Sequence, residues 1–182
     1  VLAPAVLADG AAPWRRAAGV AGEPRGAGPL FAGHAALPWP DEPHLALWHA
    51  QTLLREFRGD GHVAALVGEG LDGLDALISH AGSGDVPAAV LQATRAWSDD
   101  EWAAGVASMA ERGLVHADGS FTDEGRAQRE RIEATTDRLA VAPWAAIGAE
   151  ACESLRAIGK DLSRRVIDAG LLAVDPKRYL ED

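Results

Sequence analysis

Four side chains that could bind a ligand recur at helical spacing in the first third of the chain. His44, Trp48, Thr52 and Arg55 are separated by four, four and three residues, so a helix would place them along one stripe. Leucines surround this stripe. An indole and a guanidinium in apolar surroundings are typical of a pocket for an aromatic or anionic organic molecule. We therefore take these four residues as candidate ligand-binding residues.

Two further polar residues follow this stripe. Asp60 and His62 lie in and just after the segment Arg58-Gly59-Asp60-Gly61, and we add both to the candidate ligand site. A second interpretation is structural: Arg55 pairs with Asp60 or Glu56, because a buried arginine requires an anion. A third is an enzyme of unknown class that uses Arg55, Asp60 and His62.

Familiar catalytic and metal-binding patterns are missing from the sequence. His62 and His80 could join Asp60 around a metal ion, but no His-x-x-x-His or Glu-x-x-His spacing accompanies them. No Gly-x-Ser-x-Gly elbow and no phosphate-binding glycine loop occurs. The single cysteine, Cys152, excludes a cysteine-based zinc cage. We expect no cofactor, no metal and no catalytic residue.

The charge and hydropathy of the chain limit its partners. The 27 acidic residues outnumber the 17 lysines and arginines, for a net charge of −10, which disfavours nucleic acid as a partner. No run of about 18 apolar residues could span a membrane. The first residues lack the basic region of a signal peptide, so we expect a cytoplasmic protein.

The distribution of proline and glycine divides the chain. Residues 1–43 contain seven prolines and are predicted to form an irregular arm. The remainder, 44–182, is predicted to be a helical domain, with helices over 44–57, 62–67, 71–81, 86–96, 98–112 and 122–139. The last helix, 145–170, is a candidate contact for a homodimer.

A hairpin is expected between the helices 98–112 and 122–139. Asp118-Gly119 stands between two short apolar pairs, which is the strong short-range signal for a two-residue turn. The predicted fold class is therefore all-α with a small β-wing: a winged helix-turn-helix core at about 84–140, plus packed flanking helices.

Two motifs in this core carry a family resemblance. Met109-Ala-Glu-Arg-Gly-Leu-Val and Phe121-Thr-Asp-Glu-Gly-Arg resemble the wing-flanking motifs of MarR-type regulators, in which "L-x-x-R-G-L-V" ends the helix before the wing and "L-T-x-x-G-R" begins the helix after it. The resemblance covers about a third of the chain and implies a winged helix.

Further segments resemble the SalK-type helix-turn-helix proteins of actinobacteria. They are Pro38-Trp-Pro, Leu45-Ala-Leu-Trp-His, the run from Leu54 to Leu66, and Ala96-Trp-Ser-Asp-Asp-Glu-Trp. The biochemical role of that group is poorly defined, so this resemblance implies a fold rather than an activity.

The presumptive recognition helix argues against DNA binding. Trp102, Val106 and Met109 would face the core, and the opposite face would carry Asp100, Ala104, Ser108 and Glu111. No side chain on that face suits a base edge. We predict a regulator-like, non-enzymatic protein that binds a small organic molecule between its N-terminal helices and the winged helix. A MarR-like DNA-binding repressor is the alternative, and Arg126, Arg129 and Arg131 are its candidate DNA contacts.

Overall fold

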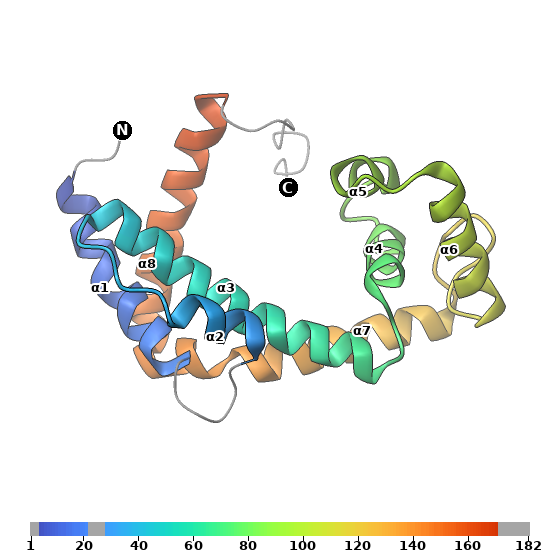
Figure 1. Cartoon of the computed structure of the whole chain (residues 1–182), viewed down its shortest axis with the longest axis horizontal. Coiled ribbons are helices and arrows are strands. Elements are labelled where there is room, and N and C mark those ends of the chain that lie inside the picture. The colour runs from blue at the N-terminus through green and yellow to red at the C-terminus, as the bar shows by residue number, and fades with distance from the viewer. Residues whose placement is uncertain (1–3, 22–27, 171–182) are drawn as a thin grey trace. The chain divides into compact units, whose positions relative to one another are not determined.

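The computed structural model describes residues 4–21 and 28–170, and all of its regular secondary structure is helical. The helices are α1 (Pro4–Ala21), α2 (Pro29–Ala35), α3 (Pro43–Gly68), α4 (Gly73–Gly82), α5 (Ala88–Arg95), α6 (Asp99–Glu111), α7 (Asp123–Ala140) and α8 (Ala142–Asp168) (Figure 1). The all-α part of the predicted fold class is confirmed.

The predicted irregular arm contains two helices. α1 is 18 residues long and includes Pro13, and α2 is a seven-residue helix that begins at a proline. Pro13 breaks α1 less than expected because the following turns are packed: Ala17, Ala18 and Ala21 are at most 2% exposed. The burial of these small side chains against neighbouring helices outweighs the cost of one proline. The positions of proline and glycine in the sequence do not reveal this tertiary burial.

The predicted break at Gly59 and Gly61 is also wrong. α3 continues through both glycines for 26 residues. A glycine inside a helix costs about 1 kcal/mol of stability relative to alanine. The burial of apolar side chains on either side of the two glycines stabilises the helix by more than that. Phe57 is 8% exposed before the glycines, and Leu66 is 9% exposed after them.

The helices divide into two compact units. Unit 1 comprises residues 1–61 and 136–182, and unit 2 comprises residues 62–135. In unit 1, α1 packs along α8 (Figure 1). The buried core of unit 1 consists of Ala17, Ala18, Ala21, Phe31, Ala50, Leu53, Leu54 and Phe57, with Trp14, Trp39, Trp144 and Ile147 packed against it.

Unit 2 contains α4, α5 and α6 together with the end of α3 and the start of α7. Its α4 packs against both α5 and α6. The core of unit 2 consists of Ala65, Leu66, Leu71, Ile78, Met109, Leu114, Val115, Phe121 and Ile132. The predicted inward face of α6 is confirmed, since Trp102 and Val106 pack against this core and Met109 is 1% exposed. Ser98 and Glu101 form a capping box at the start of α6, which agrees with the predicted start of this helix at residue 98.

The predicted β-wing is absent from the described residues. The segment between α6 and α7 makes one isolated antiparallel bridge, Val115 to Phe121, and no strand. Gly119 does adopt the predicted positive φ, 83°. Two backbone hydrogen bonds flank the bridge, from the His116 amide to the Ser120 carbonyl oxygen at 2.7 Å and from the Thr122 amide to the Leu114 carbonyl oxygen at 3.3 Å. The pairing ends there because α7 begins at the next residue, Asp123, and the Thr122 Oγ1 accepts a hydrogen bond from the Gly125 amide of its first turn at 3.0 Å. The expectation of a β-wing is therefore wrong: a tight turn connects α6 and α7.

Among the described residues, no helix is both long and apolar enough to cross a membrane.

α8 is interrupted at Gly148, whose φ of 81° and ψ of 165° are not helical. The long second part of α8, after Gly148, forms one wall of the site described next.

Candidate functional sites

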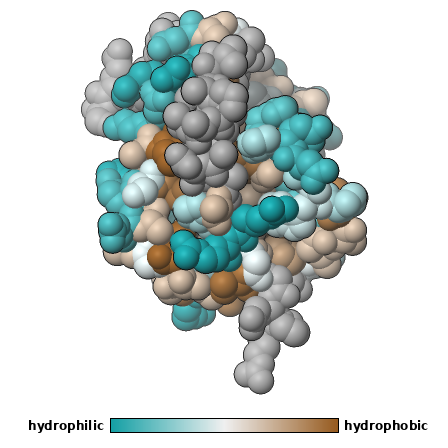
Figure 2. Space-filling view, turned by 90° about the vertical axis from the view of Figure 1, so that its left-hand side faces the viewer, coloured by the Kyte–Doolittle hydropathy of each residue, from teal (hydrophilic) through white to brown (hydrophobic). Residues whose placement is uncertain are grey.

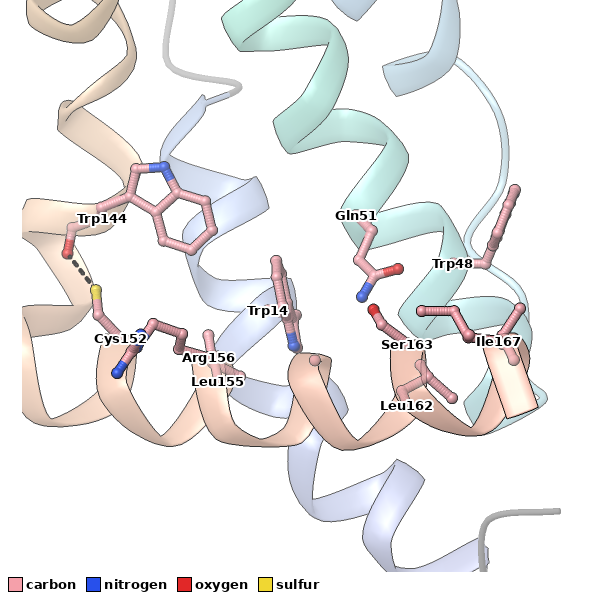
Figure 3. A pocket seen from close by; sticks show the side chains of 12 residues that line it. Trp14, Trp48, Gln51, Trp144, Cys152, Leu155, Arg156, Leu162, Ser163 and Ile167 are labelled. Carbon is pink, nitrogen blue, oxygen red and sulfur yellow. Dashed lines mark hydrogen bonds between the residues drawn. The ribbon is translucent and has the colours of Figure 1, made fainter. Parts of the chain in front are cut away.

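Unit 1 contains a cavity of about 770 Å³ between α1, α3 and α8 (Figure 3). Three tryptophans from three helices line it: Trp14 of α1, Trp48 of α3 and Trp144 of α8. The other lining residues are Gln51, Cys152, Leu155, Arg156, Gly159, Leu162, Ser163, Val166 and Ile167. The volume lies within the range of about 300–1,000 Å³ that is usual for small-molecule pockets.

Helical periodicity explains the α8 wall of this cavity. Leu155, Gly159, Leu162 and Val166 are separated by four, three and four residues, so they lie on one face of the helix. Leu155 is 1% exposed and forms the base of that face. This spacing is a sequence signal that could have identified the wall.

Trp14 and Trp144 meet inside the cavity. Their ring centroids lie 5.6 Å apart at an interplanar angle of 80°, which is the favourable edge-to-face arrangement of aromatic rings. The Cys152 thiol donates to the Trp144 carbonyl oxygen at 3.5 Å. The indole N–H of Trp14 is buried and finds no acceptor within the described part of the chain.

The cation at the edge of the cavity is already paired. Arg156 donates to both carboxylate oxygens of Glu153, at 3.1 and 3.0 Å. These hydrogen bonds hold the pKa of Glu153 below its ordinary value and raise that of Arg156. The remaining polar groups on the wall, Gln51 and Ser163, are uncharged. The cavity therefore presents apolar and neutral polar groups to a ligand.

One predicted ligand residue lines the cavity. Trp48 is 72% exposed and stands at the far side of the cavity from Trp144 (Figure 3). The Thr52 hydroxyl donates to the Trp48 carbonyl oxygen at 2.9 Å, one turn along α3. His44 is exposed in the first turn of α3. Figure 2 shows the face that lies on the left-hand side of Figure 1, where hydrophobic patches lie between hydrophilic side chains.

The other predicted ligand residues lie outside the cavity. Arg55 is exposed over 80% of its side chain and pairs with Glu56. Asp60 accepts hydrogen bonds from the amides of Leu30 at 3.2 Å and Phe31 at 2.9 Å, so its carboxylate caps the start of α2. His62 is partly buried on the following turn of α3.

A buried histidine on α3 has no counterpart in the sequence prediction. His49 is 8% exposed, and its Nε2 has no hydrogen-bond partner. Its ring meets Trp39 edge-on at 4.7 Å, and the Arg15 guanidinium lies 4.4 Å from the centre of the same indole. Burial lowers the pKa of His49, and the nearby His34 and Arg15 lower it further.

Unit 2 carries the candidate nucleic-acid interface, the outward face of α6. Asp100, Ala104, Ser108 and Glu111 are exposed there. The segment 98–113 has four acidic residues against one arginine, for a net charge of −3. That arginine, Arg112, donates to Asp75 Oδ2 at 2.7 Å and to the Gly70 carbonyl oxygen at 2.9 Å, so it holds α6 against the start of α4.

The three candidate DNA-contacting arginines lie on α7, and each has a protein partner. Arg131 donates to both carboxylate oxygens of Glu69, at 3.3 and 3.1 Å, and to Glu124 at 3.2 Å. Arg129 pairs with Glu133 at 2.9 Å. The exposed Arg126 guanidinium lies 5.9 Å from the centre of the Phe121 ring.

Among the residues that the structure describes, no group of three His, Cys, Asp or Glu side chains is arranged to hold a metal ion.

Comparison with known proteins places the chain in a family. No curated protein and no solved structure matches the sequence. A family model described as a helix-turn-helix family matches residues 2–173, nearly the whole chain, and the protein therefore belongs to that helix-turn-helix family.

Proposed function

We propose that this protein is a regulator-like helix-turn-helix protein that binds a small organic molecule in the cavity between α1, α3 and α8. The cavity itself is the observation that carries the proposal: three tryptophans and an apolar face of α8 surround about 770 Å³. Among the described residues, its lining contains no histidine or carboxylate that could act as a general base beside Cys152. The proposal is therefore one of binding rather than catalysis.

This proposal moves the ligand from the position that the sequence suggested. Of the six predicted residues, Trp48 belongs to the cavity. A ligand of about 20 non-hydrogen atoms, at roughly 0.3 kcal/mol each, would bind with about 6 kcal/mol, which is a Kd on the order of 40 µM.

A test requires an uncharged planar probe and a variant that fills the cavity. Nile red, whose fluorescence rises in apolar surroundings, should bind the purified protein with a micromolar Kd. A Cβ added at Gly159 would meet no atom within 4 Å, so the backbone there accepts a side chain, and Gly159→Phe directs a ring into the cavity that Gly159 lines. We expect this variant to lose at least about tenfold in affinity for Nile red.

Lys160→Phe is the matched control, because it adds the same ring at an exposed position one residue away on α8. The control should bind Nile red like the parent protein. Equal Nile red affinity in the parent protein and Gly159→Phe would refute the cavity as the binding site, and so would the absence of any saturable binding.

A second candidate function is DNA binding, which family membership favours. The net charge of −3 on segment 98–113 and the pairing of Arg129 and Arg131 with carboxylates disfavour it. Selection from a random-sequence duplex pool, followed by fluorescence anisotropy of the enriched and the random duplexes at about 0.15 M salt, tests it. We expect no submicromolar binding, and submicromolar binding of an enriched duplex in preference to the random one would establish the second candidate.

A further inference from the structure

The Trp14 indole is the one lining side chain with a buried polar atom that lacks a partner among the described residues. Its Nε1 is closed off from solvent and no acceptor lies within hydrogen-bonding range. An unpaired buried N–H costs the full desolvation of that group, on the order of 1–3 kcal/mol. Native proteins leave few such groups, and each one calls for an explanation such as a ligand or a bound water.

The position of this N–H links it to the cavity. Trp14 stands between Trp144 and Gln51, with its nitrogen at the end of the ring nearest α8 (Figure 3). The edge-to-face contact with Trp144 stabilises this orientation of the ring. Because the Nε1 atom has almost no solvent-exposed surface, a ligand oxygen reaches the N–H only when the indole turns or the α8 wall shifts.

The electrostatics of the wall restrict the ligand further. Arg156 is committed to Glu153 through two hydrogen bonds, and the chain as a whole carries a charge of −10. An anionic ligand would meet no free cation on the described wall and would lose its hydration on entry. A neutral hydrogen-bond acceptor loses far less hydration free energy when it enters the cavity.

We propose that the ligand is an uncharged, planar, mainly apolar molecule with a carbonyl oxygen, of the ketone, lactone or quinone class, that accepts the hydrogen bond of the Trp14 N–H. This inference rests on the proposed function. The apolar part lies against Trp144 and the Leu155–Leu162 face of α8. The carbonyl removes the unsatisfied donor, so binding recovers the desolvation cost that the free protein carries.

The test uses three naphthalene probes of similar size: 2-acetonaphthone, 2-ethylnaphthalene and 2-naphthoate. Each is titrated against the Nile red complex of the full chain, and its Kd is obtained from displacement. We expect the ketone to bind about five to ten times more tightly than the hydrocarbon, which is the usual net value of one hydrogen bond. The carboxylate should bind more weakly than the ketone.

Trp14→Phe keeps an aromatic ring and removes the N–H, so the ketone and the hydrocarbon should bind it equally. Trp144→Phe is the control, and the preference for the ketone should persist in it. In the parent protein, the indole N–H signal of Trp14 in a ¹⁵N–¹H spectrum should move downfield with the ketone and stay in place with the hydrocarbon. This spectrum tests the proposal without any variant.

Equal affinities for the ketone and the hydrocarbon in the parent protein would overturn the inference, as would a preference that survives Trp14→Phe. Tighter binding of 2-naphthoate than of the ketone would overturn the claim of an uncharged ligand. Absence of binding by all three probes and by Nile red is a different result, because it would refute the proposed function itself.

Discussion

Arg112 offers a direct test of what the "R-G-L-V" motif does. It is the C-cap residue of α6, and its guanidinium donates to Asp75 Oδ2 at 2.7 Å and to the Gly70 carbonyl oxygen at 2.9 Å. The Asp75 side chain is 10% exposed and belongs to the capping box of α4 with Asp72. Replacement of Arg112 by alanine would leave this carboxylate without its cation.

The expected loss of stability follows from these contacts. Removal of one partner from a fully buried ion pair costs about 3–5 kcal/mol. The Arg112 side chain is 36% exposed, so solvent screens the pair and the loss is smaller. We expect Arg112→Ala to lower the free energy of unfolding by about 2–3 kcal/mol. Arg112→Lys keeps the charge but loses the two-pronged donor, and should cost about half as much.

Urea unfolding followed by far-ultraviolet circular dichroism measures these free energies, and amide hydrogen exchange shows whether α4 and α6 lose protection. Arg126→Ala is the control: Arg126 is exposed and contacts the Phe121 ring at 5.9 Å, so its loss should cost less than about 1 kcal/mol. An Arg112→Ala variant as stable as Arg126→Ala would refute the structural role of Arg112 and would free this residue for a nucleic-acid contact.

Three further predictions concern two glycines and a histidine. Gly119→Ala should lower the free energy of unfolding by about 1 kcal/mol in urea titrations, because Gly119 has a φ of 83°. Gly125→Ala should cost about 3 kcal/mol in the same assay, because the new Cβ would lie 1.8 Å from the Leu114 carbonyl oxygen; a stable variant would contradict the close approach of α7. The pKa of His49 is lower in the folded protein than in the unfolded chain, so protonation favours the unfolded chain and stability should fall as the pH drops below about 6.5. His49→Phe should abolish that pH dependence, and an unchanged slope would assign it to another group.

Local signals predicted unit 2 well. The capping residues Ser98 and Glu101 mark the start of α6, and Asp-Gly marks the turn at Gly119. Such signals act within a few residues, so the sequence displays them directly. The prediction of a β-wing was wrong because the paired segment is too short to form strands: the Thr122 amide still bonds to Leu114, but α7 begins at the next residue.

Unit 1 was harder to predict because tertiary packing overrides local propensity there. Seven prolines in the first 43 residues indicated an irregular arm, yet the buried alanines of α1 stabilise a helix against α8. Gly59 and Gly61 indicated a break, yet α3 passes through both.

Of the predicted ligand residues, Trp48 alone is among the described residues that line the cavity. The other tryptophans of the cavity come from segments far apart in the sequence. The Trp48 stripe on α3 was visible at helical spacing, and Trp48 lines the cavity. Trp14 and Trp144 come from segments about 130 residues apart, and no spacing rule connects them. The periodic face of α8 from Leu155 to Val166 was available as a signal, but periodicity alone does not distinguish a cavity wall from a core.

The single cysteine of the chain provides the most direct measurement of whether the α1/α3/α8 cavity binds a ligand. Cys152 lines the cavity, so its rate of alkylation by N-ethylmaleimide reports on access to that site alone. With saturating Nile red, we expect alkylation to slow by about tenfold or more, while Gly159→Phe should show slow alkylation with or without the probe. An unchanged rate in the parent protein, at a concentration where Nile red is bound, would show that the ligand binds elsewhere and would contradict the proposal.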